Sequence, residues 1–148
     1  MAVDLMRPDL EMRLRLDPYA PRAARYQVAQ VDRPSPDLRD AVTLLTSELV
    51  TSAVQHCRSE RAVVELRVWM PADVVRVELR APRHDLGPPF EGEARHYSLL
   101  LLDELADRWS YEEADGQACM WFEIDRHVRE SAAGGGAGVR VPAKSLAG

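Results

Sequence analysis

Residues 35–56, SPDLRDAVTLLTSELVTSAVQH, decide how this sequence folds. Ser35 is a favourable helix cap, and Pro36 suits the first helical position, where a missing N–H costs no hydrogen bond. Downstream, apolar side chains recur at steps of four, three and four residues, the spacing of one helical face. They are Leu38, Val42, Leu45 and Leu49. The pattern predicts a long amphipathic helix that turns this face toward a core.

A polar strip lies beside the apolar one on the same predicted helix. Glu48, Ser52 and Gln55 follow one another at spacings of four and three residues, which places them on one side of the helix. Such a strip is either a solvated edge or the wall of a functional site. The helix alone leaves both interpretations open.

The flanking segments alternate between strand-like and helix-like patterns. Apolar and charged residues alternate in 11–17, 62–70 and 74–80, the period of half-buried strands. Further strands are predicted at 109–112 and 118–124, around an Ala-Asp-Gly-Gln turn. Helices are predicted at 21–31 and 94–108, and residues 81–92, rich in proline and glycine, are predicted to form a loop.

This order of elements predicts the fold class. Paired strands between helices indicate an α+β, two-layer sandwich with a mainly antiparallel sheet covered on one face by helices. A doubly wound fold would need single strands alternating with helices. We expect an N-terminal extension at 1–9, one domain at 10–126 and a flexible Gly/Ala-rich tail at 127–148.

Composition narrows the class of protein. The chain has 148 residues, 46% of them hydrophobic and 29% charged, as expected of one globular domain. The net charge of −5 argues against a phosphate-backbone binder, so no direct nucleic-acid partner is expected. No apolar run approaches membrane-spanning length and the N-terminus does not resemble a signal peptide, so we expect a cytoplasmic protein without a membrane partner. A single lysine among 19 basic residues is typical of a GC-rich bacterial genome.

The segment 47–56, SELVTSAVQH, resembles a known motif. It is similar to S-E-L-V-T-N-A-x-x-H, the first motif of the histidine-kinase-like ATPases, in the small single-domain branch of anti-sigma-factor serine kinases. Residues 99–109, LLLLDELADRW, are similar to that family's G-L-x-L-V-D-x-L-A-D-x-W segment. The resemblance covers about residues 10–126 and implies the Bergerat-type ATPase fold, and it suggests a homodimer.

The first motif implies roles for two residues on the long helix. Glu48 matches the family's glutamate, the general base or orienting group of the kinase reaction. Ser52 falls where the family has the asparagine that holds magnesium at the ATP phosphates. A serine hydroxyl is a magnesium ligand in other nucleotide sites, but it is shorter than a carboxamide.

The remaining nucleotide motifs are altered. The family's D-x-G-x-G follows the strand at 74–80 and its aspartate binds adenine, yet Ala81 stands in that position. A register slipped by four residues would substitute Asp85 and Gly87, which are otherwise ordinary turn residues. The phosphate-binding G-x-G before the next helix is replaced by His-Tyr-Ser, ending at Ser98.

The resemblance therefore implies a degenerate site on a retained fold. We expect a regulatory protein that binds a sigma factor or an anti-sigma-factor antagonist, with weak or absent ATP binding. The alternative is an active serine kinase that uses ATP and magnesium to phosphorylate an antagonist. A binder of another small ligand, or an unrelated two-layer domain, is the third possibility. Arginines along the strand faces could meet an acidic partner, although charged outer faces are common in half-buried sheets.

Overall fold

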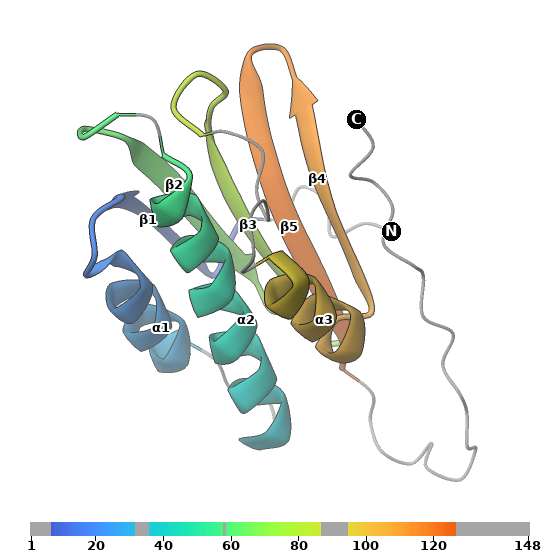
Figure 1. Ribbon diagram of the computed structural model, residues 1–148. Helices are drawn as coiled ribbons and strands as arrows, with labels where there is room; N and C mark the ends of the chain where they lie inside the picture. The colour runs from blue at the N-terminus through green and yellow to red at the C-terminus, as the bar shows by residue number, and fades with distance from the viewer. Residues whose placement is uncertain (1–6, 32–35, 58, 87–94, 127–148) are drawn as a thin grey trace, which may run out of the picture.

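A computed structural model describes residues 7–31, 36–57, 59–86 and 95–126. The described chain forms five strands and three helices (Figure 1). In chain order they are β1 (Leu10–Arg15), α1 (Ala20–Val31), α2 (Pro36–Gln55), β2 (Val63–Trp69), β3 (Val74–Pro82), α3 (Arg95–Leu105), β4 (Arg108–Ala114) and β5 (Gln117–Asp125).

The strands form one antiparallel sheet in the order β1-β2-β3-β5-β4. The three helices lie side by side on one face of this sheet, with α2 between α1 and α3 (Figure 1). The predicted α+β, two-layer architecture with an antiparallel sheet is confirmed. The opposite face of the sheet, which none of the described helices covers, is called the open face below.

The core lies between α2 and the centre of the sheet. Three members of the predicted apolar stripe, Val42, Leu45 and Leu49, are buried, and Leu38 packs against the core at the N-terminal end of the helix. They meet inward-facing side chains from the central strands, of which Phe122 on β5 is the largest fully buried one. Burying such side chains contributes about 1.5–3 kcal/mol each.

All the predicted helices and strands are present, with boundaries that differ from the sequence prediction by at most three residues. The helix predicted over 94–108 begins at Arg95 and ends at Leu105, because Arg108 already pairs with Glu123 in the sheet. The strand predicted over 74–80 continues to Pro82. At the β4–β5 turn the prediction holds: Asp115 and Gly116 both have positive φ, 54° and 77°, as a two-residue hairpin turn requires.

Candidate functional site

α2 presents the two residues assigned by the first motif one helical turn apart. Glu48 is half-buried, Ser52 is buried at 4% exposure, and neither lacks an interaction partner. Gln55, the third member of the strip, is exposed. Ser52, in the middle of the strip, is therefore enclosed, whereas Gln55 at its C-terminal end lies at the surface.

Hydrogen bonds between His56 and Ser52 stabilise the C-terminal end of α2. His56 follows the helix and its ring nitrogen Nδ1 lies 2.9 Å from the carbonyl oxygen of Ser52. The backbone N–H of His56 donates to the same carbonyl at 3.1 Å. The Ser52 carbonyl therefore has a ring contact in addition to its backbone bond, and the motif histidine has a structural role at the C-terminal end of α2.

The end of β3 is where the adenine-binding aspartate was expected. Ala81 lies within the strand, opposite Ala118 of β5, and is 3% exposed. Its methyl side chain has no hydrogen-bond acceptor, and its backbone is part of the sheet ladder. A carboxylate at this position would be buried against the core cluster to which Ala81 belongs.

A tight turn after β3 carries Asp85, the candidate of the slipped register. Asp85 donates its backbone N–H to the carbonyl of Pro82 at 2.9 Å. The next residue, Leu86, is 2% exposed and forms an antiparallel bridge with Cys57, just beyond α2. The segment therefore turns back onto the C-terminal end of α2. The Asp85 carboxylate is one-fifth exposed and lies 3.6 Å from the His84 ring.

The other two candidates are placed only in part. Ser98 lies in the first turn of α3. The helix α3 as a whole contacts α2. Gly87 lies outside the described residues. Glu48 and Ser52 thus lie on α2 itself, and the turn that carries Asp85 is bridged to Cys57, just beyond the C-terminal end of that helix.

The motif between α3 and β4 has a structural explanation. Asp103 on α3 accepts a hydrogen bond from the Trp109 indole at 3.2 Å. Asp107 accepts the backbone N–H of Asp125 at 2.7 Å, and its own N–H donates to the carbonyl of Glu123 at 2.8 Å. These bonds fasten the end of α3 to the sheet, which accounts for the aspartates in D-E-L-A-D-R-W without any ligand.

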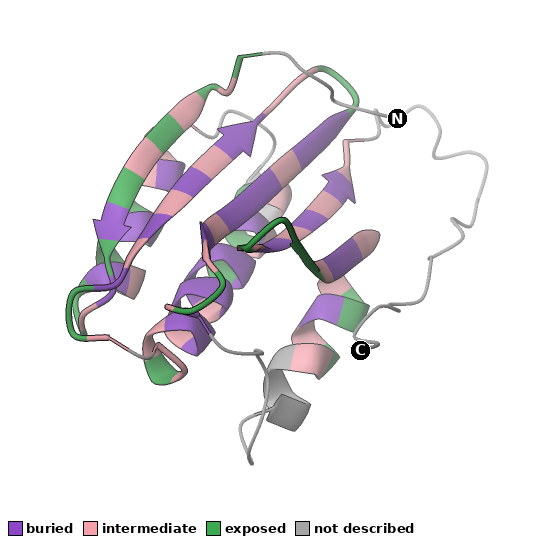
Figure 2. Cartoon of the chain, turned by 90° about the horizontal axis from the view of Figure 1, so that it is seen from above, coloured by how far each residue is buried: buried purple, intermediate pink, exposed green. Residues whose placement is uncertain are grey.

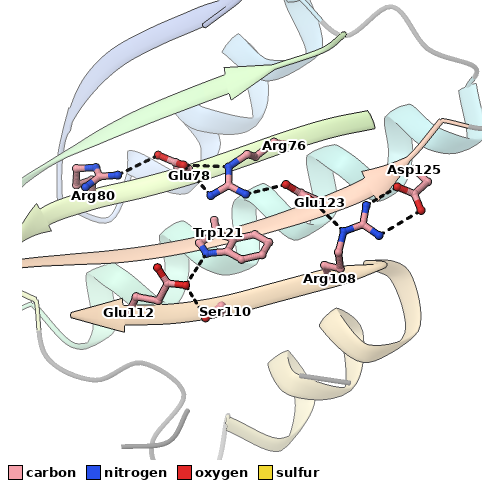
Figure 3. A network of polar contacts seen from close by, with 9 residues as sticks. All are labelled: Arg76, Glu78, Arg80, Arg108, Ser110, Glu112, Trp121, Glu123 and Asp125. Atoms are coloured by element: carbon pink, nitrogen blue, oxygen red, sulfur yellow. Dashed lines mark hydrogen bonds and ion pairs between the residues drawn. The ribbon is translucent and has the colours of Figure 1, made fainter. Parts of the chain in front are cut away.

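The open face carries a charged network that motif analysis missed (Figure 3). Arg76 bridges Glu78 at 2.8 Å and Glu123 at 2.7 Å, and its guanidinium lies 4.2 Å from the centre of the Trp121 ring. The network continues on either side through Arg80 to Glu78 and through Arg108 to Glu123 and Asp125. The period-two charge alternation along β3 could have predicted it, once the strand order was known.

Three of the strand-face arginines have acidic neighbours within the protein itself. Arg67, Arg76 and Arg80 each lie within 4 Å of a carboxylate on the same face, so they are not an uncompensated basic surface for an acidic partner. The hydrogen bond with Asp125 raises the pKa of Arg108, against an opposing effect of burial.

Cys119 lies on the open face beside this network and is buried. Burial, followed by the neighbouring Glu78 carboxylate, raises the pKa of its thiol to about 11, although Arg80 and Arg76 oppose the shift. The thiol is therefore protonated at neutral pH. A protonated, buried thiol is a poor nucleophile, so Cys119 behaves as a small apolar residue.

Comparisons and searches add no family assignment. Neither a scan against protein-family models nor a search of curated proteins found a match. Within the described ranges, no group of three or more histidine, cysteine or acidic side chains is arranged to hold a metal ion. None of the helices in that part of the chain has the length and hydropathy needed to cross a membrane.

Proposed function

We propose that this protein is a regulatory binding module of the histidine-kinase-like ATPase type, which acts on a sigma factor or an anti-sigma-factor antagonist without depending on ATP. One observation carries the proposal. At the position of the family's adenine-binding aspartate the chain has Ala81, buried in the β3–β5 ladder. A nucleotide there would lose the acceptor that distinguishes adenine from other bases, and buried polar groups of the base would go unpaired.

The core and the structural motif residues also support a binding module that does not depend on ATP. The core around α2 is intact, and the motif residues Asp103, Asp107 and His56 all serve the fold. In the motifs compared, Ser52, Ala81 and the His-Tyr-Ser segment depart from the family pattern at positions that would touch ligand. An intact core beside altered ligand positions supports a role in protein binding.

The alternative function is an ATP-dependent serine kinase, and one observation favours it. The slipped register needs the segment after β3 to fold inward, and the bridge between Leu86 and Cys57 holds it in that position. In this reading Asp85 would bind adenine, Ser52 would ligate magnesium, and Glu48 would accept the proton of the attacking hydroxyl. ATP and magnesium would then be required cofactors.

Purified partners separate the two functions. The full chain is titrated by calorimetry with each sigma factor and each antagonist from the same genome, in EDTA and in Mg-ATP. The proposal predicts one saturable complex whose dissociation constant is the same in both buffers. A complex that forms only in Mg-ATP, or none with any of these proteins, contradicts it.

Phosphate transfer tests the alternative directly. With labelled Mg-ATP, a kinase would phosphorylate an antagonist, and Glu48→Ala would abolish transfer while leaving the complex intact. Ser110→Ala is the matched control, since Ser110 lies on the open face, away from α2. Equal transfer by wild type and Glu48→Ala would eliminate the general-base assignment.

A further inference from the structure

The connection between β2 and β3, residues 70–73, lies where the two ends of the described domain meet. β1 begins beside the end of β2, because Leu10 pairs with Val68. β5 ends beside the start of β3, because Val74 pairs with Asp125. Figure 2 shows the start of β1, the partly exposed connection and the end of β5 at the same end of the sheet. The connection therefore has one end of the domain on either side of it.

Met70, the first residue of this connection, is bonded from both sides. Its backbone N–H donates to the carboxylate of Asp9, just before β1, at 2.6 Å. Its carbonyl accepts a hydrogen bond at 3.0 Å from the guanidinium of Arg126, the residue after β5. Asp9 and Arg126 lie 61 and 56 residues from Met70 in the chain. One residue thus holds side chains from opposite ends of the domain.

Further hydrogen bonds fasten the same two residues to the sheet. The backbone N–H of Asp9 donates to the carbonyl of Val68 at 2.7 Å. The Arg126 side chain also donates to the carbonyl of Pro71, and its backbone N–H donates to the carbonyl of Asp73 at 2.9 Å. Domain ends lose their order unless they are tied down, and these bonds tie both ends to one connection.

The two side-chain contacts depend on each other. Asp9 binds the N–H and Arg126 the carbonyl of the same residue, so both contacts need Met70 in one backbone conformation. When either contact is lost, Met70 gains conformational freedom, and the remaining contact alone must offset the entropy cost of ordering it. Two interactions that order the same segment therefore stabilise each other, and this coupling is reciprocal.

We propose that residues 70–73 form a latch that Asp9 and Arg126 close together, so that release on one side loosens the other. In the closed state both side chains are bonded to Met70. In the open state the start of β1 and the end of β5 are released together. A partner that engages either side chain would therefore free both ends of the domain. The latch is a conformational device of the sheet, and it is independent of nucleotide binding and of the proposed partners.

Hydrogen exchange of two backbone amides, followed by NMR on the full chain, measures this coupling. The Met70 N–H is bonded to Asp9, and the Arg126 N–H is bonded to the carbonyl of Asp73. We expect Arg126→Ala to accelerate exchange at Met70, and Asp9→Ala to accelerate exchange at Arg126. Because coupling is reciprocal, the two accelerations should be similar, about fivefold or more. The Val77 amide, in the middle of β3, reports opening of the whole sheet and should change less.

Two control variants separate a latch from a simple effect of charge. Asp9→Asn keeps an acceptor oxygen without the charge and should leave exchange at Arg126 close to that of the wild type. Asp73→Ala removes a carboxylate from the same connection but keeps the carbonyl that Arg126 uses, so both amides should be unchanged. The proposal is overturned if either amide is unaffected by loss of the opposite side chain, if Asp9→Asn acts like Asp9→Ala, or if Asp73→Ala accelerates both amides. An equal acceleration at Val77 would also overturn it, because the whole sheet would then be opening.

Discussion

Glu78 offers the sharpest test of how the open face is held together. This carboxylate is 7% exposed and accepts a hydrogen bond from Nε of Arg76 at 2.9 Å, with Arg80 at 3.4 Å on its other side. Removing one partner of a fully buried ion pair costs about 3–5 kcal/mol. Here the arginine side chains keep 19% and 37% of their exposure, and Arg76 retains Glu123. We therefore expect Glu78→Ala to lower the free energy of unfolding by about 2 kcal/mol.

Urea unfolding followed by tryptophan fluorescence measures this loss. The midpoint should fall with an unchanged m-value, and the melting temperature should fall by about 8 °C. Glu113→Ala is the matched control, because its partner Arg83 is 61% exposed and such surface pairs are worth about 0.5 kcal/mol. Equal losses in the two variants, or a loss below about 0.5 kcal/mol for Glu78→Ala, would refute the reasoning.

Three further outcomes follow from the described contacts. The pKa of the Cys119 thiol is about 11 in the folded protein and near its ordinary value in the unfolded chain, so the folded state stays protonated to a higher pH. The wild type should therefore lose up to about 3 kcal/mol of stability between pH 9 and 11 that Cys119→Ala does not lose, as measured by urea unfolding at each pH. In thiol-reagent kinetics on the native protein, half-buried Cys57 should react before Cys119. Asp107→Ala should cost about 1–2 kcal/mol in urea unfolding by orphaning the N–H of Asp125, with the circular dichroism spectrum unchanged.

Much of the fold could be predicted because periodicity reports burial. The spacing of Val42, Leu45 and Leu49, together with the start signal at Pro36, predicted α2 within a residue at each end. The end of α3 was wrong because Asp107 and Arg108 are held by β5, a contact that no local pattern contains. The network on the open face was missed for the same reason, because it depends on which strands are neighbours.

Of the candidate site, only the part on α2 could be predicted from the sequence. Glu48 and Ser52 follow from the helical repeat, and the structure places them one turn apart. The position of Asp85 depends on a turn that is held by the antiparallel bridge between Leu86 and Cys57, which lie 29 residues apart in the chain. The local sequence marks Asp85 and Gly87 only as turn residues, and no local pattern contains a contact over that distance.

Calorimetric titration with Mg-ATP tests the central claim most directly. We expect no saturable heat and no change in melting temperature at millimolar Mg-ATP or Mg-ADP, because Ala81 offers adenine no acceptor. A ligand present at 100 times its dissociation constant would add about 2.7 kcal/mol of stability. In a domain of this size that is a rise of roughly 5–15 °C. Saturable binding with such a rise, lost in Asp85→Ala, would contradict the ATP-independent function and favour the kinase alternative.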